Sequence, residues 1–466
     1  MKNLYKSVDL FDKRCYEEFL LNEDILMEHA ADGINRYIRE NFEKNSRVLI
    51  VAGPGNNGGD GVTLARLLFK DYDVSLFMPY GAKSEMCKIQ FDRFFAVGGE
   101  VSEDIKEYDI VVDALFGSGL SKPLKEDTVV LIKKLNSLKA AKIAVDIPSG
   151  IDIDGKPLPI AFKADITFTM GALKSSLFMD LAKDYVGEVR VVDLGVSKKL
   201  YEGKSNIKLL EKEDFNPPFR DRKSTHKGDF GHLAVIAGEK EGAAIIAGLS
   251  ALNFGAGLVT IITNRDINIP YELMHSNTLP KTTSAIAVGM GLGLEYSDED
   301  FNRLVFENSF SLVVDADLFY SQKIKEILKR KNLVLTPHPK EFASMLKILD
   351  IADVSSKEIQ ENRLYFVKEF CKRYEDSVLL LKGANPIIAK GEKVFINPLG
   401  TNALSKGGSG DVLTGLIGAL LAQGYEPLDA AIQASLAHAI ASREVDKANY
   451  ALTPNDLIKA IGCIKK

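Results

Sequence analysis

Short apolar runs alternate with longer amphipathic segments along the N-terminal part of the chain. The runs are rich in β-branched residues and short, so each predicts a buried strand of a parallel sheet. Between them apolar positions recur at helical spacing, and residues 9–43 also predict helix. Strands that alternate with helices predict a doubly wound parallel sheet with helices on both faces. The predicted strands lie at residues 47–53, 73–78, 109–117, 142–150, 165–170 and 188–195.

A second series of the same kind follows a polar segment. Residues 204–229 contain mixed charges and Pro217-Pro218, which is typical of a connection between domains. We therefore predict two α/β domains, at residues 1–210 and 218–466. The second is also expected to have a mainly parallel sheet, followed by a hairpin that turns at Lys390–Glu392. Its predicted strands lie at residues 232–238, 258–263, 285–293, 311–317, 333–339 and 377–383, and the hairpin at 386–398.

Composition agrees with this organisation and excludes several classes of protein. The 466 residues exceed one ordinary core, and 46% hydrophobic and 26% charged residues are typical of globular proteins. A net charge of −5 and a pI near 5.9 argue against a nucleic-acid or acidic-membrane partner. No apolar run approaches the ~18 residues of a membrane span, and the charged N-terminus does not resemble a signal peptide. The four cysteines lie far apart without a CxxC pair, which favours free thiols in the cytoplasm over a metal cluster.

The most distinctive stretch is NPLGTNALSKGGSGDVLTG, at residues 397–415. Three glycines surround Ser409, and an apolar, helix-like run follows. Such glycines let several backbone N–H groups approach one anion, and the start of a helix adds unpaired donors. Asp411 would repel a phosphate, but it is expected if its carboxylate acts on a hydroxyl group beside the phosphates. The alternative is that Asp411 only caps the helix.

Further polar loops fall where strands of the first series end. GPGNNGGDG, at residues 53–61, is a glycine-rich turn suited to close approach of a nucleotide, although it is neither GxGxxG nor a Walker loop. A tight turn without function is the alternative. Asp113, Asp146 and Ser149 follow at later strand ends, where ligands of open α/β sheets bind, although acids there are often only caps. The side chains of Asn57, Asp113 and Ser149 together offer hard oxygen ligands. Such ligands favour an alkali or alkaline-earth cation over zinc.

The second series carries its own polar residues around the same edge of its predicted sheet. Any one of them is more often a surface residue than a catalyst, but together they indicate a site. They are HKGDFG at 226–231, GMGLG at 289–293, Asp315 and Asp317, His338 and Glu341, and Lys382 and Gly383.

These motifs resemble those of two known families. GPGNNGGDG, DALFGSGL and VDIPSGID, with the helix LMEHAADGI, resemble the NAD(P)HX epimerase domain of the YjeF N-terminal family. HKGDFG, GMGLG, TPHPKE, LKGANP and GGSGDVLTG resemble the ADP-dependent NAD(P)HX dehydratases. Both sets occur in order between Leu26 and Gly424, so the whole chain resembles the bifunctional NAD(P)H-hydrate repair family. The resemblance implies an N-terminal Rossmann-like doubly wound sheet and a C-terminal ribokinase-like α/β domain.

The resemblance also implies a reaction, the repair of NADHX and NADPHX, in which water has added across the nicotinamide ring with the hydroxyl group at C6. The first domain would interconvert the R and S forms, and the second would use ADP to dehydrate the S form to NAD(P)H. By motif match, Asp146 and Asp411 would be the catalytic residues. K⁺ would bind Asn57, Asp113 and Ser149, Mg²⁺ would accompany the nucleotide, and the protein would form a homo-oligomer.

The same motif matches assign binding residues in both domains. In the first domain NAD(P)HX would contact Asn56, Asn57, Gly58, Gly59, Asp60, Gly117, Ser118, Gly119, Leu120, Ser121, Lys122 and Pro123. In the second it would contact Gly291, His338, Pro339, Lys340, Glu341, Phe342, Ala343 and Ser344. ADP would contact Lys382, Gly383, Ala384, Asn385, Pro386, Thr401, Asn402, Ala403, Leu404, Ser405, Lys406, Gly407, Gly408, Ser409 and Gly410.

Another function fits part of the same pattern. Ribokinase-like enzymes use a Gly-Gly-x-Gly-Asp site for phosphoryl transfer, so the second half could be a vitamin or sugar kinase fused to a non-catalytic binding module. The epimerase-like half favours repair, because such a kinase has no evident use for it. The chain departs from the family pattern at His29 (usually Asn), at Leu173 (often Pro) and at Thr401-Asn402 (usually Gly-Asn). These differences concern helix packing and nucleotide affinity more than the chemistry.

Overall fold

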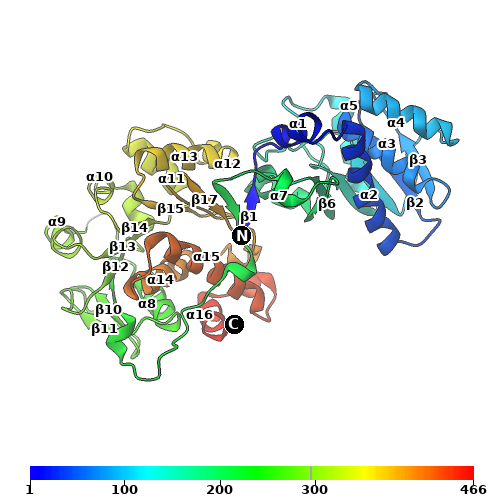
Figure 1. Ribbon diagram of the computed structural model, residues 1–466. Coiled ribbons are helices and arrows are strands. Elements are labelled where there is room, and N and C mark those ends of the chain that lie inside the picture. Colours follow the sequence, from blue (N-terminus) through cyan, green and yellow to red (C-terminus); the bar gives the residue numbers. More distant parts are fainter. Residues whose placement is uncertain (294–295, 466) are drawn as a thin grey trace. The chain divides into compact units, whose positions relative to one another are not determined.

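The computed structural model describes residues 1–293 and 296–465, and the chain divides into two compact units (Figure 1). Residues 3–205 form the N-terminal unit, and residues 206–466 with Met1 and Lys2 form the C-terminal unit. Each unit is built on its own mainly parallel sheet with helices packed against it. The predicted fold class, two α/β domains, is confirmed. A short strand, β1 (Lys2–Leu4), begins the chain.

The sheet of the N-terminal unit has the strand order β3-β2-β4-β5-β6-β7, and every neighbouring pair is parallel. From β2 the chain crosses to β3 on one side and then returns to β4 on the other side. In a doubly wound sheet, such a reversal opens a crevice at the carboxyl ends of the two strands. The strands are β2 (Arg47–Ala52), β3 (Asp73–Phe77), β4 (Ile110–Ala114), β5 (Ala141–Val145), β6 (Ile166–Met170) and β7 (Glu188–Val192).

The helices of this unit differ from the prediction in two places. The segment predicted as continuous helix breaks at Leu20, which has a left-handed φ of 57°. The second difference is that α3 begins at Asn56, so the glycine-rich turn itself is helical. The helices are α1 (Asp9–Glu17), α2 (Glu23–Asn41), α3 (Asn56–Leu68), α4 (Glu85–Ala96), α5 (Glu126–Ser137), α6 (Lys183–Val186) and α7 (Lys198–Tyr201), with 3₁₀ turns at Ser175–Phe178 and Asp180–Ala182.

From β8 onward, the sheet of the C-terminal unit runs in the order β8-β17-β16-β15-β14-β13-β12-β9-β10-β11. The predicted hairpin is present as β16 and β17, which pair antiparallel, and β15 with β16 is also antiparallel. The strands β8 and β11 were not predicted, because three residues are too few to show a pattern. The strands are β8 (Ile207–Leu209), β9 (His232–Ile236), β10 (Leu258–Ile262), β11 (Met274–Ser276), β12 (Ala285–Val288), β13 (Ser311–Val314), β14 (Leu333–Leu335), β15 (Val378–Leu381), β16 (Ile387–Lys390) and β17 (Lys393–Ile396).

The apolar run after Asp411 forms the central helix of this unit, α14. From Val412 to Ala422 every residue of this helix is buried, because α8, α15 and α16 pack around it over the sheet. An apolar surface on all sides is expected of such a helix. The helices are α8 (Glu241–Asn253), α9 (Asp298–Phe301), α10 (Ile324–Ile327), α11 (Pro339–Ile348), α12 (Ser356–Glu361), α13 (Arg363–Arg373), α14 (Ser409–Ala422), α15 (Pro427–Glu444) and α16 (Pro454–Cys463).

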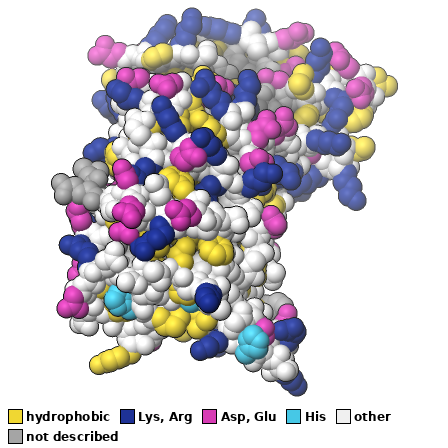
Figure 2. Space-filling view, turned by 90° about the vertical axis from the view of Figure 1, so that its left-hand side faces the viewer, with side chains coloured by type: hydrophobic (Ala, Val, Ile, Leu, Met, Phe, Trp, Pro, Cys, Tyr) yellow, Lys and Arg dark blue, Asp and Glu magenta, His cyan; other side chains and the backbone are white. Residues whose placement is uncertain are grey.

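The surface carries charges of both signs. Figure 2 shows Lys and Arg side chains interspersed with Asp and Glu over the visible face. Within the described part of the chain, no helix combines the length and the apolar character that crossing a bilayer requires.

Candidate active sites

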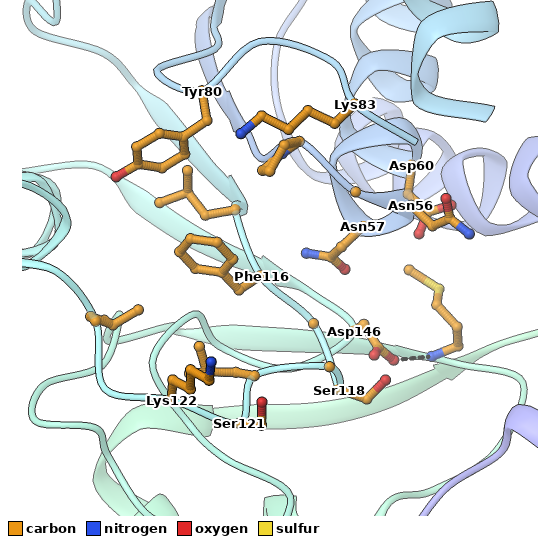
Figure 3. Close-up of a pocket in the computed structure, with 18 of the residues that line it drawn as sticks. Asn56, Asn57, Asp60, Tyr80, Lys83, Phe116, Ser118, Ser121, Lys122 and Asp146 are labelled. Carbon is orange, nitrogen blue, oxygen red and sulfur yellow. Dashed lines mark hydrogen bonds between the residues drawn. The ribbon is translucent and has the colours of Figure 1, made fainter. Parts of the chain in front are cut away.

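A cavity of about 710 Å³ lies at the strand-order reversal between β2 and β4 (Figure 3). Its volume lies within the ~300–1,000 Å³ range of small-molecule sites. The segments that follow β2 and β4 form much of its wall, and Asp146, Met170 and Lys174 complete the end near β5 and β6. Tyr80 and Phe116 stack beside the cavity, with ring centroids 6.2 Å apart and an interplanar angle of 29°.

Glycines bring the first turns of α3 close to the sheet. A Cβ atom on Gly58 would lie 1.8 Å from the carbonyl oxygen of Gly53, and one on Gly61 would lie 2.6 Å from Cβ of Ala114. No side chain fits at either position, so glycine is required for the close approach. Gly58 and Gly59 are buried and do not line the cavity, and their contact with substrate stays a prediction. The other predicted residues, Asn56, Asn57, Asp60 and the loop 117–123, all line the cavity.

Asn57 has unsatisfied polar atoms. Among the described residues, neither Oδ1 nor Nδ2 of its side chain has a hydrogen-bond partner, although both atoms are buried. A buried amide without partners costs about 1–3 kcal/mol, so a ligand that supplies the partners is expected. Gly117 leaves room beside it, because a Cβ atom there would lie only 3.0 Å from Asn57 Oδ1 and 3.1 Å from Asp146 Oδ2.

Asp146 follows β5 in a left-handed conformation, with φ of 68°. Asp adopts this region more readily than most residues, but it remains uncommon and is typical of functional sites. Its Oδ1 accepts hydrogen bonds from Lys174 Nζ at 2.5 Å (dashed in Figure 3) and from the backbone N–H of Met170 at 3.2 Å. Its Oδ2 lies toward Gly117. One oxygen is therefore fixed by the protein while the other faces the cavity.

Lys174 was not predicted as a site residue. Its side chain is only 1% exposed, and its ammonium group donates to Asp146, to Thr169 Oγ1 at 3.1 Å and to the carbonyl of Met170 at 3.2 Å. All three donors of the ammonium group are therefore satisfied. The sequence shows only a lysine after an apolar run, and nothing there indicates that it reaches Asp146.

Two further carboxyl groups, of Asp12 and Asp60, line the same cavity. Burial raises the pKa of Asp60 well above its ordinary value, and the charges of Asp146 and Asp12 raise it further. Burial also raises the pKa of Asp12, although the hydrogen bond that it accepts from Tyr201 at 2.6 Å has the opposite effect. The cavity thus places proton donors and acceptors around one small space.

The predicted cation ligands are partly brought together. Asp113 is fully buried and accepts hydrogen bonds from the Ser149 hydroxyl at 2.6 Å, from the Ser149 N–H at 2.7 Å and from the Leu115 N–H at 3.2 Å. Burial raises the pKa of Asp113 to about 6 in spite of these bonds. The Ser149 hydroxyl also accepts from the N–H of Phe116, next to Gly117, which borders Asn57. The Asp113–Ser149 pair thus supports the loop that Asn57 faces.

A second cluster of titratable groups surrounds Asp411 in the C-terminal unit. Gly408, with φ of 87°, occupies the N-cap position of α14, so Asp411 is not the cap, and that alternative is wrong. Burial raises the pKa of Asp411 to about 6; the charge of Asp315 adds to this rise, and Lys382 opposes it. In the described part of the chain, the Asp411 carboxylate has no hydrogen-bond or ion-pair partner. It can therefore accept a proton.

Lys382 lies at the centre of this cluster. Its ammonium group is 2.7 Å from Asp315 Oδ1 and 3.7 Å from Glu341 Oε2. Glu341 in turn is 3.1 Å from the ring of His338, and burial raises the pKa of Glu341 to about 7. Asp315 belongs to the set of strand-end residues that the sequence indicated as a site, but the motif matches assigned it no role; here it lies in the cluster as the partner of Lys382.

Of the other residues predicted to contact NAD(P)HX in this unit, some border the cluster and others lie in the core or in α11. Gly291 lies in the loop whose Gly293 N–H donates to Asp317 at 2.9 Å, so GMGLG borders the cluster. Phe342 and Ala343 are buried in the core, whereas Pro339, Lys340 and Ser344 belong to the first turns of α11.

The two segments predicted to bind ADP lie next to each other. A Cβ atom on Gly400 would lie 3.3 Å from the carbonyl of Ala384, and one on Gly410 would lie 3.4 Å from Lys382 Nζ. Side-chain contacts fix the second segment at Thr401, which donates to Ser442 at 3.0 Å, and at Ser409, which lies 3.1 Å from His438 Nε2. The segments lie at residues 382–386 and 401–410.

Comparisons with known proteins agree for both units. Residues 23–176 match the family described as YjeF-related protein N-terminus, and residues 233–462 match the family described as NAD(P)H-hydrate dehydratase. A bifunctional NAD(P)H-hydrate repair enzyme Nnr of Helicobacter pylori is 45% identical over 475 residues, covering 99% of each chain. Relatives with the same description from Dictyoglomus turgidum (32% identical, 98% of this chain and 96% of that one) and Escherichia coli (33%, 90% and 84%) are also similar.

Proposed function

The chain belongs to the family of bifunctional NAD(P)H-hydrate repair enzymes, and from this premise we propose how its two sites divide the work. The family predicted from the sequence motifs is confirmed. The chain is a bifunctional enzyme with an epimerase domain and an ADP-dependent dehydratase domain. We assign residues 1–210 to the epimerase and residues 218–466 to the dehydratase. The similarity covers 99% of the chain, which favours repair over a kinase joined to an inert module.

The cavity at the strand-order reversal is the proposed site of epimerisation. C6 of NAD(P)HX carries its hydroxyl group beside the ring nitrogen, so its configuration changes when a bond at C6 opens and re-forms. Whether the bond that opens is the one to the hydroxyl oxygen or the one to the ring nitrogen, a group must give and take one proton at the hydroxyl oxygen. The observation that carries the assignment is Asp146, with Oδ1 fixed by Lys174 and Oδ2 free beside Gly117. Asp146 exchanges the proton, and Lys174 fixes its orientation and balances its charge.

The neighbourhood of Asn57 fits the K⁺ that the family resemblance implies. Asn57 Oδ1 is a buried oxygen without a partner, and an amide oxygen is a hard ligand that suits such an ion. Asn57, Asp113 and Ser149 would hold the cation. When bound, it would supply a fixed positive charge that helps to retain the substrate. Its removal should slow epimerisation and leave dehydration unchanged.

The Asp411 cluster is the proposed site of dehydration. Hydroxide is a poor leaving group, so ADP when bound would supply a phosphoryl group to the C6 oxygen, with release of AMP. Loss of phosphate from C6 and of the proton from the neighbouring ring carbon would then restore the double bond of NAD(P)H. Asp411 takes the proton of the C6 hydroxyl group, for which its free carboxylate is suited. The glycines before it and the adjacent segment 382–386 hold the nucleotide. His338 and Glu341, which lie beside Lys382, are proposed to contact the substrate.

Mg²⁺ is proposed to enter with the nucleotide. The described residues contain no group of three or more His, Cys, Asp or Glu side chains placed to hold a metal ion. Mg²⁺ is commonly held through substrate phosphates and water, with few protein ligands. We further propose that the protein is a cytoplasmic homo-oligomer that acts on NADHX and NADPHX, and its net charge of −5 disfavours a nucleic-acid partner.

The test is recovery of NADH from a mixture of both NADHX epimers, followed by absorbance with and without ADP. Complete recovery that requires ADP supports both assignments. Recovery of only the S fraction would show that the first site does not epimerise. Stable accumulation of a phosphorylated small molecule without NADH would support the kinase instead.

A further inference from the structure

The Lys382 ammonium group is surrounded by acidic side chains, yet it binds only some of them. It contacts Asp315 at 2.7 Å and lies 3.7 Å from Glu341. Asp411 is close by, because its neighbour Gly410 would place a Cβ atom 3.4 Å from Lys382 Nζ and 3.8 Å from Asp315 Oδ2. The described residues nevertheless include no ion pair between Lys382 and Asp411.

Asp315 is the group that holds the ammonium. It is only 2% exposed and lies at the end of β13. Its Oδ1 accepts from Lys382, and its Oδ2 accepts from the Thr414 hydroxyl at 2.8 Å. Thr414 lies three residues after Asp411 on α14, which puts both side chains on neighbouring positions of one helix face. One helix thus carries the proton acceptor and the group that fixes Asp315.

This arrangement lets Lys382 supply positive charge near Asp411 without forming an ion pair with the Asp411 carboxylate. A largely buried lysine without a carboxylate partner is unfavourable, and the Lys382 side chain is only 20% exposed, so it is expected to bind an acid. If it bound Asp411 directly, the ion pair would occupy the carboxylate and make it a weak base. With Asp315 in place, Lys382 contributes positive charge nearby while Asp411 stays free.

We propose that Asp315 is a positioning residue of the dehydration reaction, which with Thr414 holds the Lys382 ammonium group beside Asp411 but off its carboxylate. The assignment rests on the proposed role of Asp411 as proton acceptor. It gives Lys382 a role beside its predicted contact with ADP, because its ammonium group also supplies positive charge next to Asp411.

The charges of the cluster give the proposal a pH signature. Burial is the largest influence that raises the pKa of Asp411; the charge of Asp315 raises it further, and that of Lys382 lowers it. Beyond Lys382, the charged or titratable groups described around the cluster are Glu341, whose pKa burial raises, His338 and His438, whose pKa values burial lowers, Asp317 and Tyr320. Loss of the Asp315 charge should therefore lower the pKa of Asp411, and loss of the Lys382 charge should raise it.

The test measures kcat for dehydration of (S)-NADHX against pH in the full-length protein. For Asp315→Asn, the acidic limb of the kcat–pH profile should move to lower pH. The value of kcat at pH 8 should fall roughly 10- to 100-fold, because the Asp411 carboxylate becomes a weaker base and is displaced. The KM values for ADP and NADHX should change little. Lys382→Met should move the acidic limb to higher pH. Thr414→Val should lower kcat in the same direction as Asp315→Asn but less, and Thr414→Ser should restore it.

Several results would overturn the proposal. One is an acidic limb that Asp315→Asn leaves in place, and another is a loss confined to KM for ADP, which would make Asp315 a nucleotide ligand. If Asp315→Asn fails to fold, equal kcat for Thr414→Val and Thr414→Ser would count against positioning. Failure of the proposed function is distinguishable, because Asp411→Asn would then remain active.

Discussion

Replacement of Gly117 by alanine tests the geometry of the epimerisation site. The added methyl group would lie 3.0 Å from Asn57 Oδ1 and 3.1 Å from Asp146 Oδ2. Because Asp146 is proposed to exchange a proton at the C6 hydroxyl group, the nicotinamide ring is expected to occupy this space. The backbone there is not left-handed, so alanine adds no conformational strain. Stability should change by no more than about 1 kcal/mol, because the reduced entropy of the unfolded chain offsets the close contacts. A displacement of the ring approaching 1 Å should slow epimerisation about 100-fold, equivalent to ~2.7 kcal/mol.

One absorbance trace measures this effect. When ADP is added to both NADHX epimers, the S form is converted directly in a fast phase, and the R form is recovered at the rate of epimerisation. In Gly117→Ala the fast phase should be unchanged and the slow phase should approach the rate measured without protein. Gly242→Ala is the comparison away from this cavity, because a Cβ atom there meets no other atom within 4 Å and the residue is not a predicted substrate contact. Its slow phase should change by about twofold at most. A slow phase of Gly117→Ala within that range would refute the placement of the ring.

Three further predictions follow from the same sites. Lys174→Met leaves the buried Asp146 carboxylate without its cation and should lower the free energy of unfolding by about 3–5 kcal/mol, measured by urea denaturation; an unchanged midpoint would contradict the pairing. Replacing K⁺ by tetramethylammonium should slow the epimerisation phase alone, and KCl should raise the melting temperature of the wild type but not of Asn57→Leu; equal responses would remove the cation from Asn57. Dehydration should lose kcat/KM below about pH 6, because Asp411, whose pKa is raised to about 6, must be ionised to accept a proton. A profile that stays flat down to pH 5 would exclude it as the base.

Much of the fold could be predicted from the sequence because parallel strands carry strong local signals. The run from Arg47 to Ala52 is buried from Val48 onward, and such runs stay apolar throughout since both faces are covered. The loops that follow them were found for the same reason, as parallel strands bring their carboxyl ends to one edge. The cavity at that edge contains the predicted Asn57 and Asp146.

What the sequence did not reveal depends on contacts between distant residues. Lys382 and Asp315 are 67 positions apart, and Lys174 and Asp146 are 28 apart, so no local pattern links either pair. The predicted start of α3 was also wrong, because glycines usually oppose helix formation and residues 53–61 were therefore predicted to form a turn. Here they allow the helix to lie against Gly53, a tertiary contact that outweighs propensity.

The central claim is that two independent sites act in sequence on one substrate. Its most direct test is recovery of NADH from a mixture of both epimers by Asp146→Asn, by Asp411→Asn, and by the two single variants mixed in one reaction. Asn tolerates the left-handed conformation of residue 146, so that substitution removes the charge and preserves the backbone. We predict that Asp146→Asn recovers only the S fraction, that Asp411→Asn recovers none, and that the mixture recovers everything. Full recovery by either variant alone would contradict the account.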